Sequence, residues 1–223
     1  MALLRGHWQL LALTGAVFVL WQTPAVVPLK VLIVFFHEAS HAIATLLTGG
    51  DVVSLSVSPD QGGLVISRGG SRFITLTAGY LGSLVIGVAL LLAATRTAAD
   101  RKVMALCGVV TLVIAGLYVR DLFALAFCVG MGAAMLLMAR FLGHNANDLA
   151  LRVIGLTSMI YVPYDIFSDT IARANLRSDA RMLAEEFGGT TMMWGGLWLI
   201  VSLAVIAWCL RRGLGRNSNL KLR

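Results

Sequence analysis

The stretch VLIVFFHEASHAIATLL, residues 31–47, places three ionisable side chains inside an otherwise apolar run. His37 and His41 are four residues apart, so on a helix they lie on one face, about 6 Å from each other. Glu38 precedes His41 by three residues and falls on the same side. Ionisable groups are costly to bury in an apolar segment, and where they occur they indicate a functional site.

The spacing matches the His-Glu-x-x-His pattern, in which two imidazoles bind Zn²⁺ and the glutamate accepts a proton from water activated by the metal. We therefore predict that His37 and His41 are zinc ligands and that Glu38 is the catalytic base. The competing interpretation is that three unliganded polar groups pack against neighbouring helices. The apolar flanks disfavour a chance match, because they leave the motif no solvated helix face.

The composition indicates a polytopic membrane protein. Of the 223 residues, 58% are hydrophobic and only 13% are charged, against roughly 25% charged in a typical soluble domain. We predict an all-α membrane fold with about six to seven transmembrane helices in a single metallopeptidase domain spanning residues 1–223. Apolar runs long enough to cross a bilayer lie at residues 8–23, 28–48, 73–95, 103–119, 121–139, 149–167 and 191–210.

The least certain boundary between spans is at Arg120 and Asp121. These two charges either form a tight turn between two helices or lie paired inside one bent helix. The glycines and alanine at 78, 79 and 82 form a small-residue face on the third run, which lets two helices approach closely in lipid. We expect this face to contact the helix that carries the motif.

A short β-hairpin is predicted directly after the motif helix. Gly49 and Gly50 end that helix, and two β-branched runs at residues 51–58 and 64–67 flank a Pro/Gly turn at 59–63. An exposed edge of such a hairpin can hold a peptide in extended form by strand addition. A plain connecting loop is the alternative.

The net charge of +7 does not indicate nucleic-acid binding, because the positive residues are scattered through loops and the C-terminal tail. This distribution is typical of membrane topology signals and of attraction to an anionic lipid bilayer. The three cysteines each lie in an apolar run and are predicted to be small buried side chains. The tail residues are Arg211, Arg212, Arg216, Lys221 and Arg223, and the cysteines are Cys107, Cys128 and Cys209.

Catalytic zinc usually takes three protein ligands, so a carboxylate must complete the site. Asp165 and Asp169 are spaced i, i+4 at the end of an apolar run, and two close carboxylates favour a cation between them. We predict Asp165 as the third ligand, with Asp169 as the alternative ligand or as a residue that orients one; Asp169 could also simply pair with Arg173. We set aside Asp51, Asp60, Asp100, Asp179, Glu185 and Glu186 as loop residues, Asp121 because Arg120 adjoins it, and Asp148 because it follows a polar stretch.

Several motifs together resemble the site-2 protease family of intramembrane zinc metallopeptidases, in the branch found in bacteria and plants. The resemblance implies zinc bound by His37 and His41, with Glu38 as base and an aspartate on a later span as third ligand. Better-studied members carry Asp-Gly at that position, whereas Ile166 follows Asp165 here. The motifs are HEASHA (37–42), TGG (48–50), GG (69–70), AGYLG (78–82) and YDIFSD (164–169).

We therefore expect a Zn²⁺-dependent intramembrane metalloendopeptidase of the regulated intramembrane proteolysis type. The expected partner is a transmembrane protein or peptide substrate, and the expected location is the bacterial cell membrane. A metal-ion transporter is a rival, but it usually has a second metal motif and a His-rich loop, and the chain has only four histidines. The other rival is an inactive relative that only binds membrane proteins, which the intact Glu38 disfavours.

Overall fold

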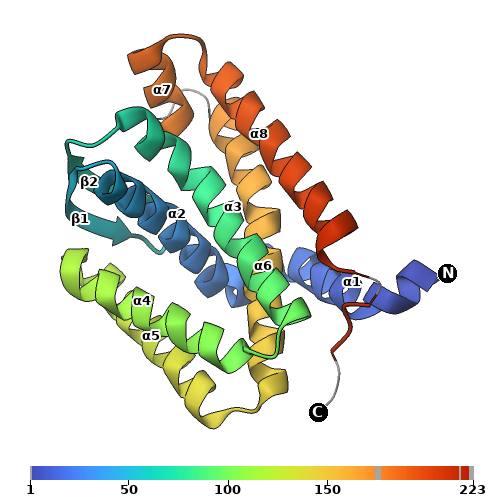
Figure 1. The fold of residues 1–223 in the computed structure, drawn as a ribbon. Coiled ribbons are helices and arrows are strands. Elements are labelled where there is room, and N and C mark those ends of the chain that lie inside the picture. The colour runs from blue at the N-terminus through green and yellow to red at the C-terminus, as the bar shows by residue number, and fades with distance from the viewer. Residues whose placement is uncertain (1, 174–176, 216, 221–223) are drawn as a thin grey trace.

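The computed structural model describes residues 2–173, 177–215 and 217–220 of the chain (Figure 1). Helices account for most of it, and one two-stranded sheet follows the second long helix. In chain order the elements are α1 (Ala2–Leu20), η1 (Pro24–Val26), α2 (Val27–Leu47), β1 (Asp51–Val57), β2 (Gly63–Arg68), α3 (Arg72–Arg96), α4 (Asp100–Tyr118), α5 (Leu122–Phe141), α6 (His144–Phe167), η2 (Ser168–Ala172), α7 (Asp179–Phe187), α8 (Thr191–Trp208) and η3 (Cys209–Gly213).

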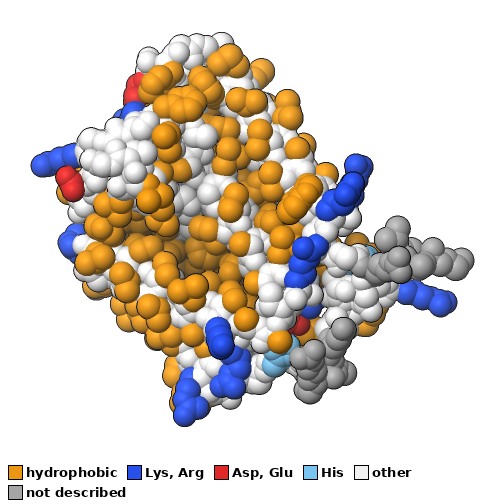
Figure 2. All heavy atoms as spheres, in the orientation of Figure 1, with side chains coloured by type: hydrophobic (Ala, Val, Ile, Leu, Met, Phe, Trp, Pro, Cys, Tyr) orange, Lys and Arg blue, Asp and Glu red, His pale blue; other side chains and the backbone are white. Residues whose placement is uncertain are grey.

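The predicted membrane fold is confirmed. Within the described residues, six helices are long and apolar enough to cross a bilayer, based on α2, α3, α4, α5, α6 and α8. The run predicted at residues 8–23 forms α1, which is not among these six. In Figure 2, apolar side chains cover the middle of the visible face and Lys and Arg side chains lie towards its edges. The chain is therefore an integral, multi-pass membrane protein.

The boundary at Arg120 and Asp121 is a tight turn between two helices, one of the two predicted alternatives. The Asp121 carboxylate caps α5 by accepting a hydrogen bond from the backbone N–H of Ala124 at 2.8 Å. The Arg120 guanidinium donates to the backbone carbonyl of Val119 at 2.9 Å, at the end of α4. Both charges therefore satisfy helix ends, and α4 and α5 form an antiparallel pair on one side of the bundle (Figure 1).

Helix α2 lies in the middle of the molecule, between the hairpin and helices α3 and α6 (Figure 1). The predicted contact with α3 is confirmed, and glycines make it close. A Cβ atom added at Gly82 would lie 2.5 Å from the Cβ of Ser40 on α2. Gly79, one turn earlier, would place a Cβ against His37 and within 2.6 Å of the Cε1 atom of His41. The motif helix is therefore held at a distance that only glycine permits.

The predicted β-hairpin is also confirmed. Strands β1 and β2 pair antiparallel, with Val57 opposite Gly63 next to the turn and Asp51 opposite Arg68 at the open end. Leu55 is fully buried and forms a parallel bridge with Val119, so β1 faces the α4–α5 turn. Both strands also contact the motif helix α2. A lone hairpin is marginal in water, and here α2 supports it.

At the end of the molecule away from the hairpin, the C-terminal segment makes polar contacts with two helices. Arg152 of α6 forms a buried ion pair with Asp148 at 2.7 Å and also donates to the backbone carbonyl of Ser218. The hydroxyl of Ser218 lies 2.7 Å from Nδ1 of His7 on α1. The C-terminal segment therefore joins α6 to α1. The predicted tail residues Arg216, Lys221 and Arg223 lie outside the described residues.

The structure also places Asp100 and the three cysteines. Asp100 does not lie in a loop: it begins α4, is fully buried and pairs with His144 at 2.8 Å. Cys128 and Cys209 are buried and Cys107 is partly buried, and none forms a disulfide with another described residue. The expectation of small, unpaired, largely buried thiols is confirmed.

Candidate metal centre

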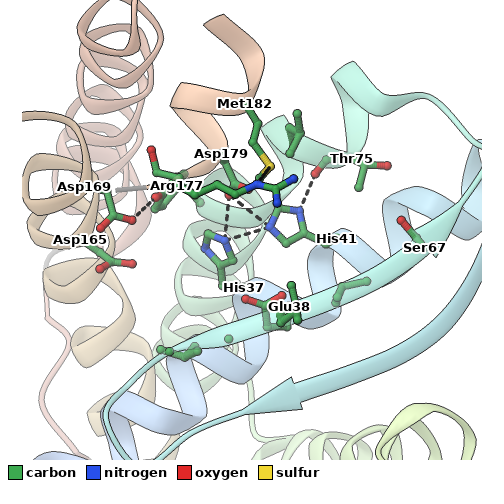
Figure 3. Close-up of a pocket in the computed structure, with 18 of the residues that line it drawn as sticks. His37, Glu38, His41, Ser67, Thr75, Asp165, Asp169, Arg177, Asp179 and Met182 are labelled. Carbon is green, nitrogen blue, oxygen red and sulfur yellow. Dashed lines mark hydrogen bonds and ion pairs between the residues drawn. The ribbon is translucent and has the colours of Figure 1, made fainter. Parts of the chain in front are cut away.

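Helix α2 brings the imidazoles of His37 and His41 together. Proline lies in its first turn, and Gly49, with φ of +81°, follows its last turn, so the helix runs unbroken through the motif. The ring centroids of the two histidines are 4.6 Å apart, and their Nε2 atoms are 3.0 Å apart. Both nitrogens face α7 rather than the hairpin (Figure 3).

Asp179 supplies the third donor of this cluster. Its Oδ2 atom lies 3.0 Å from Nε2 of His37 and 3.2 Å from Nε2 of His41. Asp179 is the first residue of α7, whose start is capped by the Ser178 hydroxyl, and only 7% of its surface is exposed. The assignment of Asp179 to a loop is therefore wrong, and the structure makes Asp179 a candidate for the third donor.

The protonation pattern of the cluster leaves a lone pair directed at its centre. The ring Nδ1 of His41 lies 2.6 Å from the backbone carbonyl of Thr75, which can only accept a hydrogen bond. Nδ1 therefore carries the hydrogen, and in the neutral ring Nε2 carries the lone pair. That lone pair faces the Asp179 carboxylate and the other imidazole. Acceptors that face one another in this way need either a proton or a metal ion between them.

The distances fit Zn²⁺. Ligand bonds of about 2.0–2.1 Å in tetrahedral geometry place donor atoms about 3.3 Å apart. The three donor atoms here are 3.0–3.2 Å apart. Two imidazole nitrogens and one carboxylate oxygen are also a common donor set of catalytic zinc, which leaves a fourth position for water or substrate.

The charge of Asp179 suits a metal ligand. Burial alone would raise the pKa of its carboxyl group, but attraction to His41 and, when both rings carry a proton on Nε2 in place of a metal, hydrogen bonds from His37 and His41 outweigh that effect. The pKa of Asp179 is therefore held well below its usual range. The carboxylate stays ionised and available as a donor at neutral pH.

Asp165 and Asp169 line the same cavity but lie outside the donor cluster. Asp169 accepts a hydrogen bond of 2.5 Å from the Tyr80 hydroxyl and one of 2.7 Å from Arg173. Asp165 lies 4.0 Å from the same guanidinium. The two carboxylates were expected to share a metal ion. In the structure Arg173 supplies the positive charge between them. In this geometry Asp179 replaces Asp165, the predicted ligand, and Asp169, the predicted alternative, as the candidate third donor.

Glu38 is placed by the hairpin. The residue is only 6% exposed, and its carboxylate lies against Gly63, the first residue of β2. A Cβ atom at Gly63 would overlap Oε1 of Glu38, so glycine is required for the present position of the carboxylate. None of the described residues hydrogen-bonds to Glu38, which leaves both oxygens available to a reactant.

A cavity of about 530 Å³ opens onto the metal centre (Figure 3). Residues 61–67 of the hairpin form one wall, α2 and α3 form the floor, and α6 and α7 form the remaining walls. Pockets of this volume accommodate sizeable organic ligands. A few residues of an extended peptide would fit beside His37, Glu38 and His41.

A family model described as Peptidase M50B-like matches residues 10–209, which is most of the chain. The chain belongs to the Peptidase M50B-like family. This is the site-2 protease family, so the resemblance noted in the sequence is confirmed. No curated protein and no solved structure matches the chain.

Membership of the Peptidase M50B-like family indicates a membrane metallopeptidase, in agreement with the spans and the donor cluster.

Asp179 is not predicted as a ligand from the sequence, because the segment between α6 and α8 is expected to be a loop. A signal for α7 was present: Ser178 is a strong N-cap residue, and Ala180 and Leu183 follow at helical spacing. Sequence alone did not indicate that this helix lies against α2.

Proposed function

We propose that the chain is a zinc-dependent intramembrane metalloendopeptidase that hydrolyses peptide bonds of membrane-embedded substrates. The observation that carries the proposal is the donor triangle of His37, His41 and Asp179, with the buried Glu38 beside it, inside a bundle of membrane-spanning helices. The same donors in a site open to water would not point to a membrane-embedded substrate. The bilayer and a transmembrane protein or peptide are the partners we propose.

The residues divide the chemistry between them. His37, His41 and Asp179 would hold a Zn²⁺ ion, which would supply the Lewis acidity that polarises the scissile carbonyl and acidifies the attacking water. Glu38 accepts the proton of that water and passes it to the leaving amine as the peptide bond breaks. The Thr75 carbonyl fixes the ring of His41 through Nδ1, so that Nε2 stays directed at the centre. Tyr80, edge-on to His37 with centroids 4.6 Å apart, limits rotation of the other ring.

The hairpin is the place where we propose that the substrate is held. A helical substrate has its carbonyls in intrahelical hydrogen bonds, so the segment to be cut must unwind first. Strand β2 lines the cavity, and an extended segment can add to its edge by main-chain hydrogen bonds. Ile66→Pro, at an exposed position of β2, should lower cleavage of a model transmembrane peptide several-fold with zinc content unchanged. Equal cleavage by Ile66→Pro and Ile66→Thr would contradict this role.

The metal assignment is tested by elemental analysis of detergent-purified protein prepared without chelators. We expect one zinc per chain in the wild type and in Glu38→Gln, because the glutamate is not a ligand. His41→Ala and Asp179→Asn should lose the metal. Asp165→Asn should keep it, because Asp165 lies outside the donor cluster.

Cleavage of a model transmembrane peptide by the same preparations separates the candidate functions. Cleavage by the wild type and none by zinc-loaded Glu38→Gln would support the peptidase. Zinc binding without cleavage of any tested membrane peptide would favour an inactive relative. Loss of zinc in Asp165→Asn but not in Asp179→Asn would overturn the ligand set.

A further inference from the structure

Two arginines converge on one sulfur atom at the rim of the cavity. Nη2 of Arg72, at the start of α3, and Nε of Arg177, just before α7, each lie 3.3 Å from Sδ of Met182. Met182 is three residues after Asp179 on α7 and lines the same cavity. A thioether is a weak acceptor, so it does little to offset two neighbouring positive charges.

The two guanidinium groups differ in their ion pairs. Arg72 pairs with Glu186, with 3.0 Å between Nε and Oε1. The third arginine of the cavity, Arg173, pairs with Asp169 at 2.7 Å. Arg177 forms no ion pair in the described part of the chain, which contains all 11 Asp and Glu residues. One positive charge at the rim is therefore left without a protein anion.

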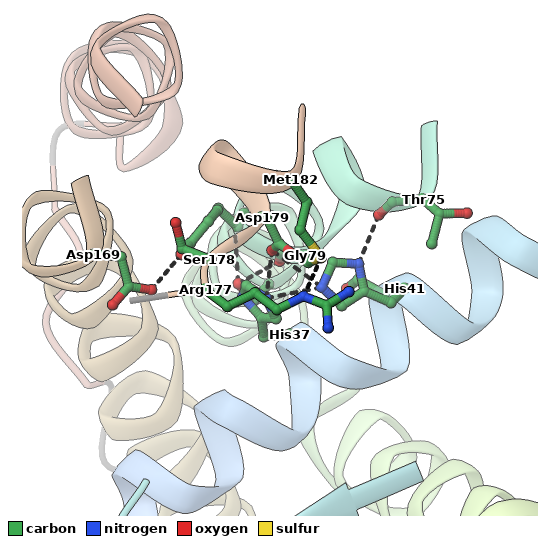
Figure 4. A network of polar contacts seen from close by, with 12 residues as sticks. His37, His41, Thr75, Gly79, Asp169, Arg177, Ser178, Asp179 and Met182 are labelled. Carbon is green, nitrogen blue, oxygen red and sulfur yellow. Dashed lines mark hydrogen bonds and ion pairs between the residues drawn. The ribbon is translucent and has the colours of Figure 1, made fainter. Parts of the chain in front are cut away.

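Arg177 is positioned to use that charge on a bound molecule. Figures 3 and 4 show its side chain extending across the donor cluster, with the guanidinium towards His41 and Met182. Asp165 and Asp169 lie on the other side of His37 (Figure 3). The cavity thus has a cationic side near α3 and α7 and an acidic side near the end of α6. A peptide lying along β2 would pass between the two.

We propose that Arg177, assisted by Arg72, binds a carboxylate of the peptide substrate and so selects substrates that carry an acidic group near the scissile bond. The planar fork of a guanidinium matches a carboxylate, and the terminal N–H groups of Arg177 have no acceptor among the described residues. The carboxylate comes either from an Asp or Glu side chain or from a free C-terminus. This inference rests on the proposed peptidase function for its biological meaning, but the binding itself does not require cleavage.

The test measures binding by zinc-loaded Glu38→Gln protein, which holds a substrate without turning it over. The probes are fluorescent transmembrane peptides of one sequence, each with a single Glu or Gln at one of several central positions, made with a free or an amidated C-terminus. Dissociation constants are measured by fluorescence anisotropy in detergent. The measurement is repeated in the Glu38→Gln background with Arg177→Gln, Arg177→Lys and Arg181→Gln.

Arg181→Gln is the matched control, because Arg181 is a nearby arginine on α7 that pairs with Glu185 at 2.8 Å and does not line the cavity. We expect at least one Glu peptide to bind about fivefold more tightly than its Gln counterpart, the change typical of a partly exposed charge pair. Arg177→Gln should abolish that preference, Arg177→Lys should reduce it, and Arg181→Gln should leave it unchanged. A preference for the free over the amidated C-terminus would identify the terminal carboxylate as the bound group.

Three results would overturn the proposal: equal binding of acidic and neutral peptides, a preference that persists in both Arg177 variants, or equal weakening of all peptides by Arg177→Gln. Raising the salt concentration gives a check that needs no variant, because a charge preference at the exposed rim must shrink as salt increases. Wild-type protein that shows the preference but never cleaves would refute the peptidase and leave the carboxylate site intact. The two proposals therefore fail separately.

Discussion

At the scale of single residues, the position of the Glu38 carboxylate depends on the absence of a Cβ atom at residue 63. Glu38 is buried on α2, and its carboxylate fills the space where Gly63 would carry a Cβ. Gly63 is a strand residue opposite Val57 and has no positive φ, so alanine is compatible with the backbone there. A methyl group at position 63 therefore acts on the glutamate and not on the fold of the hairpin.

We expect Gly63→Ala to lower kcat for a model transmembrane peptide about 100-fold, since a displacement of about 1 Å can cost that much. Zinc content should stay at one per chain, because the donor atoms of His37, His41 and Asp179 face one another next to α7 and do not contact Gly63. Gly62→Ala is the control: its Cβ would meet only the Ser58 hydroxyl, at 3.1 Å. Unchanged kcat in Gly63→Ala would show that Glu38 does not act from its present position.

At the scale of elements, the contact between α2 and α3 determines whether the imidazoles can reach the metal. Gly79 faces both His37 and His41, and Gly82 faces Ser40 one turn along. The sequence was sufficient to predict this contact, because small residues recur on one face of α3. It was also sufficient to predict the hairpin and six of the seven expected spans, all but the run at residues 8–23, since each follows from a local pattern of apolar runs and turn residues.

The position of α7 was not predictable in the same way. It is a short helix of nine residues that contributes Asp179 to a site on α2, far away in the sequence. No local pattern encodes such a long-range contact. A search for the third ligand limited to apolar segments favours Asp165. Its partner in the structure is Arg173, which directly follows η2.

We expect Gly79→Ala to lose zinc. The new Cβ would overlap Nε2 of His37 and approach Cε1 of His41 within 2.6 Å, so the donor triangle cannot keep its geometry. Gly116→Ala on α4, where a Cβ meets nothing within 4 Å, should retain one zinc per chain. Elemental analysis after size-exclusion chromatography measures both, and full zinc occupancy in a monodisperse Gly79→Ala protein would refute the contact.

At the scale of the whole molecule, the candidate metal centre and the polar contacts of the C-terminal segment lie at separate ends. The metal centre faces the end of α6, whereas the buried pair of Asp148 and Arg152 lies near its beginning, about 25 Å away at 1.5 Å per residue. Arg152 also holds the backbone of Ser218, and Ser218 contacts His7. Stability and chemistry can therefore be changed independently.

Arg152→Met should lower the free energy of unfolding by about 3 kcal/mol, because it leaves the Asp148 carboxylate buried without a partner. The midpoint of thermal unfolding in detergent, followed by tryptophan fluorescence, measures this effect. Adding Asp148→Asn to the same chain should recover part of the loss, because the unpaired charge is removed. Zinc content of the folded protein should not change; a loss of zinc in Arg152→Met would mean that the two ends are coupled.

His37 and Asp179 are 142 positions apart in the chain, and this separation has a consequence for synthesis. Ribosomes add about 5–20 residues per second, so the growing chain carries both histidines and Glu38 for roughly 7–28 seconds before the last donor is made. With two donors the metal is held weakly. We therefore expect a nascent chain to stay harmless to the membrane proteins around it until its final helices have been inserted. For the proposed peptidase, the order of translation therefore delays activity until the last donor has been made.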